Sequence, residues 1–185
     1  YDGCMKSMGR AAFHEYYRLL FETEAEFKQF LENLERSSLP ILRFDPKNEL
    51  RLRELWQQNN LPWKTLSWHE HALTLPEGVP LGTELPGYKE KLFYPMNASS
   101  LAPVLALDVQ PGEFVLDACA APGGKALFIS ELLGENGKLI ANDSSAARRN
   151  RMKKIFEEYG VRNATITGFK AETIFKQIEN GKMDA

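Results

Sequence analysis

The sequence is poor in cysteine and histidine and holds no long apolar run. Its 185 residues include two cysteines and three histidines. So few ligating residues make neither a disulfide framework nor a metal-binding cluster, and we expect no metal and a reducing, intracellular location, the cytoplasm. No apolar stretch approaches the roughly 20 residues of a membrane span, and no signal peptide opens the chain. We therefore expect no membrane association.

The chain also has little net charge. The formal net charge is −2, which gives no global attraction to nucleic acid, so any such binding would require a local basic patch. What is present is an ordinary globular composition, with 43% hydrophobic and 26% charged residues. A chain of this length allows one or two small domains, and its sequence leaves the oligomeric state open.

A loop rich in proline and glycine divides the chain. The segment 75–87, LPEGVPLGTELPG, contains three prolines and three glycines. We take it as the boundary between two parts. The predicted organisation is a small α+β domain over residues 1–75, a linker over 76–90, and the first half of a second domain over 91–185.

The first part has the pattern of a mixed domain. A capping box, Thr23 with Glu26, precedes an apolar stripe at helical spacing. The predicted elements, in order, are a helix over 23–37, a strand over 39–44, a helix over 48–60, and short strands over 64–68 and 71–75.

The second part alternates strand and helix patterns with short turns, which is typical of a parallel sheet covered by helices. We therefore predict a Rossmann-like α/β fold, in which ligands bind at the carboxyl ends of the strands. The predicted strands are 113–118, 137–143 and 161–168, with a new strand beginning at 182–185, and the predicted helices are 125–134, 146–160 and 171–180.

The turn after the first of these strands consists almost entirely of small residues, which let a backbone approach a ligand closely. The free N–H groups of the helix that follows attract an anionic group. Lys125 opens that helix, where the helix dipole disfavours a cation by about 0.3–1 kcal/mol, so we expect it to have a polar or anionic partner. The candidate cofactor-binding residues here are Asp117, Cys119, Ala120, Ala121, Pro122, Gly123, Gly124 and Lys125.

Asp143 ends the second strand, twenty residues after Gly123. At this spacing an acidic residue accepts hydrogen bonds from the ribose hydroxyls of a nucleoside ligand. Pro122 lacks an N–H that a pyrophosphate would use, so a nucleoside bearing an amine and a carboxylate fits better. S-adenosyl-L-methionine is such a molecule, with Asp117 placed to accept from its amine. The alternative is a tight turn between buried elements, with Asp143 capping the next helix.

The motif LDACAAPGGK (116–125) resembles the first cofactor motif of the Nop/Sun (Fmu-type) RNA cytosine-C5 methyltransferases. The similarity extends upstream through 92–113 and downstream through LIANDSSAARR, where the family has a ribose-binding aspartate followed by an arginine, here Asp143 and Arg148. It is specific over about residues 90–185. The family has a small domain resembling an RNA-recognition fold before this region.

The resemblance implies methylation of carbon 5 of cytosine in RNA, either tRNA or rRNA, with S-adenosyl-L-methionine as methyl donor. In this chemistry a cysteine thiolate adds to carbon 6 of the base, which makes carbon 5 nucleophilic. The family's two cysteines would lie beyond Ala185, so we expect this sequence to be the amino-terminal portion of an enzyme and inactive alone. The resemblance places Lys125 near the active site, in a catalytic role, and gives Cys119 no nucleophilic role. We expect Cys119 to be a small buried packing residue.

Two positions depart from the family pattern. Residues 169–171, Phe-Lys-Ala, stand where relatives have an aspartate near the adenine, and Lys170 cannot accept from the adenine amino group. Met96 and Asn97 replace a glutamine and an acidic residue. Two alternatives stay open: a Rossmann methyltransferase acting on another atom, or a non-catalytic module that binds cofactor or RNA.

For the other conspicuous residues we expect structural roles in the main. Five basic residues lie within 148–154, and apart from Arg148 we expect most of them on a solvated helix face. The three tryptophans could stack on RNA bases, but aromatic core residues are commoner.

Overall fold

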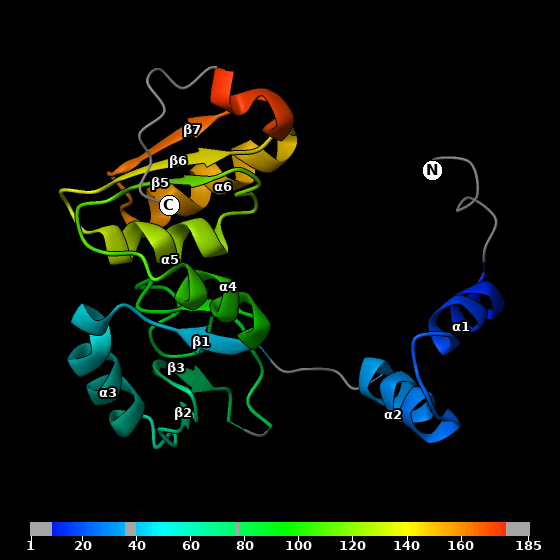
Figure 1. Cartoon of the computed structure of the whole chain (residues 1–185). Coiled ribbons are helices and arrows are strands. Elements are labelled where there is room, and N and C mark those ends of the chain that lie inside the picture. The colour runs from blue at the N-terminus through cyan, green and yellow to red at the C-terminus, as the bar shows by residue number, and fades with distance from the viewer. Residues whose placement is uncertain (1–8, 36–39, 77, 177–185) are drawn as a thin grey trace. The chain divides into compact units, whose positions relative to one another are not determined.

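The computed structural model of the chain describes residues 9–35, 40–76 and 78–176. Contacts divide the chain into two compact units, Tyr1–Ser38 and Leu39–Ala185 (Figure 1). The segment 76–90 lies inside the second unit, and its role as a boundary between domains stays a prediction. None of the helices among the described residues is long and apolar enough to cross a membrane.

In its described residues, 9–35, the first unit contains two helices, α1 (Arg10–Arg18) and α2 (Glu24–Glu35). The predicted capping box is present, because Oγ1 of Thr23 accepts from the Glu26 N–H at 3.2 Å and Oε2 of Glu26 accepts from the Thr23 N–H at 2.9 Å. Aromatic rings join the helices around the buried Phe27 of α2, whose ring centroid lies 5.7 Å from that of His14 on α1. The helix α1 has no counterpart among the predicted elements.

The second unit begins with a small antiparallel sheet of order β2-β3-β1-β4. The strands predicted over 39–44, 64–68 and 71–75 and the helix predicted over 48–60 are present. Strand β4 lies within 91–185, the range predicted for the second domain, and it pairs with β1 of the small sheet. The elements are β1 (Ile41–Arg43), a short 3-10 helix (Pro46–Asn48), α3 (Glu49–Gln58), β2 (Thr65–Leu66), β3 (His69–Thr74) and β4 (Tyr94–Met96).

Both faces of this sheet are covered. On one face Leu42 and Leu73 pack with Leu52 and Trp56 of α3. On the other face side chains of β1, β3 and β4 join the core of the parallel sheet; they are Ile41, Ala72 and Met96. All three residues of β1, including Arg43, are therefore buried. The resemblance of this part to an RNA-recognition fold stays a prediction.

The parallel sheet has the order β5-β6-β7, and this confirms the predicted Rossmann-like α/β class. Helices α5 and α6 connect neighbouring parallel strands, and their buried side chains share one core with the sheet. The helix predicted over 171–180 is a 3-10 helix over Ala171–Lys176, and its remainder and the strand predicted at 182–185 lie outside the described residues. The elements are a short 3-10 helix (Ala98–Ser100), α4 (Leu101–Leu107), β5 (Phe114–Asp117), α5 (Gly124–Leu133), β6 (Lys138–Asn142), α6 (Ala146–Tyr159) and β7 (Ala164–Thr167).

Helix α5 lies between the two sheets (Figure 1). It is apolar on nearly every side, as a helix enclosed by other elements must be. An ion pair joins it to the small sheet: the buried Arg43 of β1 forms a bidentate pair with Glu131, in which Nη2 and Oε1 are 2.9 Å apart. The Arg43 guanidinium also lies 4.8 Å from the ring centroid of Phe128. The small sheet is thus fixed to the helix that begins at the glycine turn.

Candidate functional site

The turn after β5 and the end of β6 lie side by side, as the sequence predicts. Strands β5 and β6 are parallel, with Asp117 opposite Ala141. The Ala120 N–H donates to the carbonyl of Asn142 at 2.8 Å. This bond holds the small-residue turn beside the strand end that carries Asp143, so the two parts of the proposed ligand site share one edge of the sheet.

The two glycines are required by geometry. Gly123 has φ +118°, a conformation that side chains rarely adopt, and a Cβ there would lie 3.2 Å from Cγ of Met152 on α6. A Cβ on Gly124 would lie only 2.8 Å from Cε1 of Tyr94 on β4. The turn is therefore packed between α6 and the small sheet, and its small residues serve this packing as well as any ligand.

Asp143 is 3% exposed, and each of its carboxylate oxygens has a partner within the protein. Its Oδ1 accepts from the Ser145 N–H at 3.0 Å, and its Oδ2 lies 3.2 Å from Nη1 of Arg148. The other terminal nitrogen of Arg148 donates to the carbonyl of Ala121. Arg148 thus links the acidic residue to the turn, and the carboxylate, which offers about four acceptor positions, keeps some of them for a ligand.

Asp117 and Lys125 lie at the two ends of the turn. Burial raises the pKa of Asp117, while the Cys119 N–H, which donates to Oδ1 at 3.2 Å, and the charge of Lys125 oppose that rise. The nearby Asp143 adds to it. Lys125 is exposed in the first turn of α5, and its charge acts on the Asp117 carboxylate. The polar or anionic partner expected for Lys125 stays a prediction.

Cys119 corrects one expectation. It was predicted to be a small buried packing residue, but it is a free, exposed cysteine. The reason is its place in the turn, where the neighbouring Ala120 and Ala121 take the buried positions and Pro122 is exposed beside it.

Two functional-site residues were missed by the sequence reasoning. Asn142 is completely buried, and its side chain bonds to the loops after β5 and β7. Arg149, expected on a solvated face, donates instead to the carbonyls of Asp143 and Ser144, at 2.7 and 2.9 Å. The signal available for Asn142 was an asparagine at the buried end of a predicted strand. Nothing in the sequence pattern separates Arg149 from its basic neighbours.

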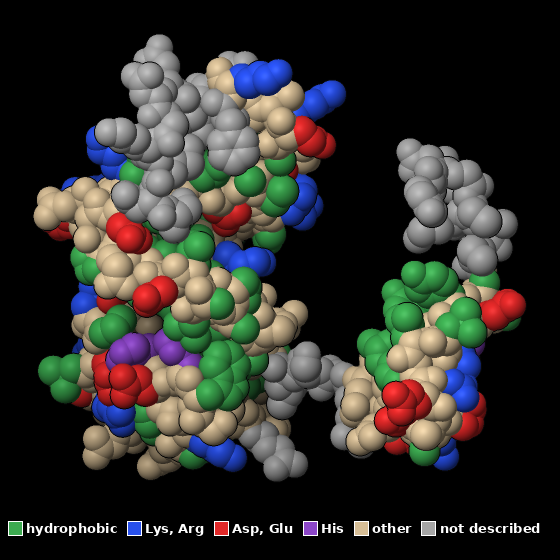
Figure 2. Space-filling model, viewed as in Figure 1, with side chains coloured by type: hydrophobic (Ala, Val, Ile, Leu, Met, Phe, Trp, Pro, Cys, Tyr) green, Lys and Arg blue, Asp and Glu red, His purple; other side chains and the backbone are tan. Residues whose placement is uncertain are grey.

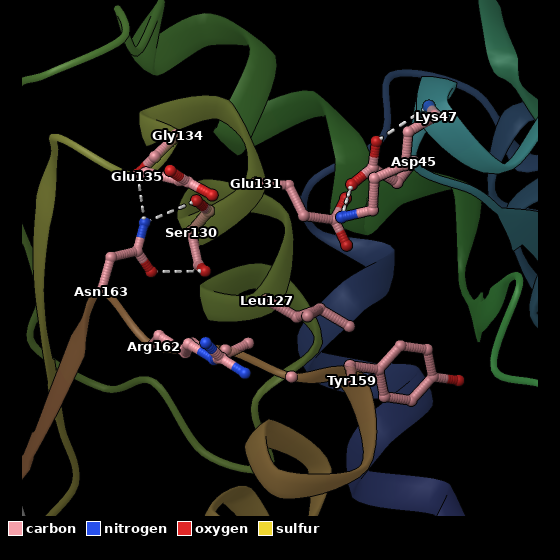
Figure 3. A pocket seen from close by; sticks show the side chains of 12 residues that line it. Asp45, Lys47, Leu127, Ser130, Glu131, Gly134, Glu135, Tyr159, Arg162 and Asn163 are labelled. Atoms are coloured by element: carbon pink, nitrogen blue, oxygen red, sulfur yellow. Dashed lines mark hydrogen bonds and ion pairs between the residues drawn. The ribbon is translucent and has the colours of Figure 1, made fainter.

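A separate pocket of about 580 Å³ lies at the other end of α5 (Figure 3). It is lined by the ends of α5 and α6, the start of the β7 segment and the loop after β1, and it includes Asn163, Arg162 and Lys47. None of the predicted site residues lines it. Some of the charged side chains that line it are paired with each other, since Nζ of Lys47 lies 2.6 Å from Oδ2 of Asp45.

The surface carries no dominant charge on the face shown in Figure 2, where basic and acidic side chains are scattered. Histidines of β3 reach this surface together, and the rings of His69 and His71 are 5.9 Å apart. Over the described ranges 9–35, 40–76 and 78–176, no three His, Cys, Asp or Glu side chains group as a metal site would require. Trp56 is buried, whereas Trp68 is 49% exposed.

Comparisons with known proteins agree with this geometry. The sequence model of a family described as 16S rRNA methyltransferase RsmB/F matches residues 104–185. The 26S rRNA (cytosine-C(5))-methyltransferase nsun-1 of Caenorhabditis elegans is 31% identical over 170 residues, 88% of this chain and 25% of that protein. The ribosomal RNA small subunit methyltransferase F of Aeromonas salmonicida is 37% identical over 122 residues, 63% of this chain and 25% of that protein. The chain thus spans about a quarter of the length of these curated relatives.

Solved structures share the fold. NSun6 from Pyrococcus horikoshii, solved with SFG, superposes with a TM-score of 0.75 at 18% identity, over 88% of this chain and 66% of that one. A methyltransferase homologue from the same organism gives a TM-score of 0.71 at 23% identity, over 96% of this chain and 61% of that one. These structures show the fold, while the matching family model and the curated relatives confirm the predicted family: the chain belongs to the Nop/Sun family of RNA cytosine-C5 methyltransferases.

Proposed function

We propose that this protein uses S-adenosyl-L-methionine to methylate carbon 5 of cytosine in RNA. The observation that carries the proposal is the buried Asp143 carboxylate beside the glycine turn, which the Ala120–Asn142 hydrogen bond holds in place. Family membership supplies the reaction class, and several relatives are named as rRNA cytosine-C5 methyltransferases.

The residues present fit the cofactor. Asp143 would accept from both ribose hydroxyls through the acceptor positions of its carboxylate that Ser145 and Arg148 leave free. The free N–H groups at the start of α5 suit the cofactor's carboxylate, and Asp117 suits its amine. The turn from Cys119 to Gly124 brings the backbone close to the ligand. NSun6 from Pyrococcus horikoshii was solved with SFG, an analogue of this cofactor, which supports the assignment. When bound, the cofactor supplies an electrophilic methyl group.

Lys125 is the proposed catalytic residue within the sequence. It is exposed at the start of α5, at the edge of the turn, where it can reach the target base or the cofactor. We propose that the nucleophilic cysteine lies beyond residue 185. Cys119 is exposed, but it sits within the turn proposed to hold the cofactor, not opposite it, so we assign it to cofactor binding.

The RNA substrate is also part of the proposal, and rRNA is favoured over tRNA because the cited relatives carry rRNA in their names. The proposed location is a reducing intracellular compartment, the cytoplasm. We propose no metal and no membrane partner, and the oligomeric state stays open.

The cofactor assignment is tested by calorimetric titration of the full-length protein with S-adenosyl-L-methionine. Asp143→Ala should weaken binding, because each lost charge-assisted hydrogen bond contributes about 1.5–3 kcal/mol. Asp143→Asn, which keeps the shape and the bond to Ser145, should show an intermediate loss. Unchanged affinity in both variants would remove Asp143 from the ribose site.

The reaction is tested by transfer of labelled methyl groups to unmodified cellular RNA, followed by nucleoside analysis. We expect 5-methylcytidine from the full-length protein and none from the 185-residue chain. A different methylated nucleoside would support a methyltransferase acting on another atom, and cofactor binding without methyl transfer would support a non-catalytic module. Formation of 5-methylcytidine by the 185-residue chain would contradict the assignment of the nucleophile, and Cys119→Ser would then be tested.

A further inference from the structure

Asn142, the last residue of β6, joins three segments of the chain. Its Nδ2 donates to the carbonyls of Ala118 and Phe169, each at 3.0 Å. Its Oδ1 accepts from the Phe169 N–H and from Oγ1 of Thr167, each at 2.9 Å. Its own carbonyl accepts from the Ala120 N–H at 2.8 Å.

These bonds use the whole capacity of the amide. An asparagine side chain offers two donors and two acceptor positions, and all four are occupied here. The side chain is 0% exposed, so water cannot replace a lost partner. A buried polar group with every partner in place specifies a single arrangement of the segments around it, because each alternative leaves an unsatisfied donor or acceptor.

The segments that it joins are the two sides of the proposed cofactor site. Ala118 and Ala120 belong to the turn after β5, and Phe169 belongs to the loop after β7, where the family pattern places the adenine. Two backbone hydrogen bonds reach the strand ends, from the Ala120 N–H to the Asn142 carbonyl and from the Asp143 N–H to the Thr167 carbonyl at 3.2 Å, but each links β6 to one side only. The Asn142 amide spans both sides, with one bond to the turn after β5 and three to the β7 side.

We propose that Asn142 is a positioning residue for the cofactor: its amide sets the separation between the glycine turn and the loop at Phe169, and so the width of the adenosine site. The proposal rests on the proposed function for the identity of the ligand. It also explains the residue type, because an aspartate of the same shape would face the carbonyls of Ala118 and Phe169 with an acceptor.

The chain offers a matched control at the opposite end of the same sheet. Asn163 donates from Nδ2 to the carbonyls of Ser130 and Gly134, each at 2.8 Å, and accepts from Oγ of Ser130 at 2.7 Å (Figure 3). It has nearly the same set of bonds as Asn142, but it lines the separate pocket and not the turn. Its aspartate variant should suffer the same kind of bond loss without touching the cofactor site.

The test compares Asn142→Asp and Asn163→Asp in the full-length protein, at a temperature where both are folded. Two quantities are measured: the affinity for S-adenosyl-L-methionine by calorimetry, and amide hydrogen exchange of segments 118–124 and 167–171. We expect Asn142→Asp to weaken binding at least about tenfold and to speed exchange in both segments, because buried donors and acceptors lose their partners. We expect Asn163→Asp to change affinity less than about twofold. If Asn142→Asp does not fold, Thr167→Val removes one of the four bonds and should weaken binding about threefold.

The outcomes separate this proposal from the proposed function. If the unsubstituted protein does not bind S-adenosyl-L-methionine, the proposed function fails, and the exchange measurement alone decides the role of Asn142. Faster exchange in both segments, specific to Asn142→Asp, supports positioning. Equal effects of the two asparagine variants on affinity would overturn the positioning role of Asn142, and so would unchanged exchange in both segments. If Thr167→Val is used in place of Asn142→Asp, the same two measurements test that role.

Discussion

Nη1 of Arg148 lies 3.2 Å from Oδ2 of Asp143, while the second terminal nitrogen of Arg148 donates to the carbonyl of Ala121. One side chain therefore ties the acidic end of β6 to the turn after β5. We expect Arg148→Met to weaken binding of S-adenosyl-L-methionine about three- to tenfold, because the two loops lose part of their preorganisation. Calorimetric titration measures the effect. Arg151→Met, at an exposed basic position of the same helix, is the control and should bind as the unsubstituted protein does.

The contact between Tyr94 and Gly124 predicts a cost for any side chain at the start of α5. A Cβ on Gly124 would lie 2.8 Å from Cε1 of Tyr94, so Gly124→Ala must push the ring out of its place. We expect a loss of about 1–3 kcal/mol in the free energy of unfolding. Gly82→Ala should be nearly neutral, because nothing lies within 4 Å of a Cβ there. Equal stability of both variants in urea denaturation would contradict the tight contact.

The ion pair between Arg43 and Glu131 predicts non-additive effects. Glu131→Gln leaves the charge of Arg43, which is 2% exposed, without its partner, and should cost about 3 kcal/mol of stability. The double variant Arg43→Met with Glu131→Met should cost less, because no uncompensated charge stays buried. Denaturation of the two variants tests this, and a double variant less stable than Glu131→Gln would refute it.

The partly buried position of His69 predicts that the free energy of unfolding decreases in acid. Burial, chiefly, and the charges of His71 and Arg43 lower the pKa of His69 below its usual 6.5. Between that lowered value and 6.5 the unfolded chain binds more protons than the folded one, so the free energy of unfolding decreases as the pH falls below about 6.5. Denaturation at several pH values between 8 and 5 measures how steeply the free energy of unfolding depends on pH. His69→Gln should flatten it, and an identical slope in this variant would exclude His69 as the cause.

The order of elements in the second unit and the meeting of the turn with Asp143 could be predicted, because hydrophobic periodicity and the spacing from Gly123 are local properties of the sequence. The pairing of β4 with β1 could not, since it depends on contacts between distant segments. The roles of Asn142 and Arg149 were hidden for a related reason: their partners are mostly backbone groups, which leave no trace in the residue pattern. The exposure of Cys119 follows from the path of the turn and not from its residue type.

The position of α5 between the two sheets affects how the second unit unfolds. The helix supplies core side chains to the parallel sheet, while Phe128 and Glu131 contact Arg43 of the antiparallel sheet. Unfolding of either sheet alone would expose apolar surface of α5 to water. On heating, the two sheets should therefore melt in one cooperative step, and a cut within 76–90 should release neither of them as a stable fragment.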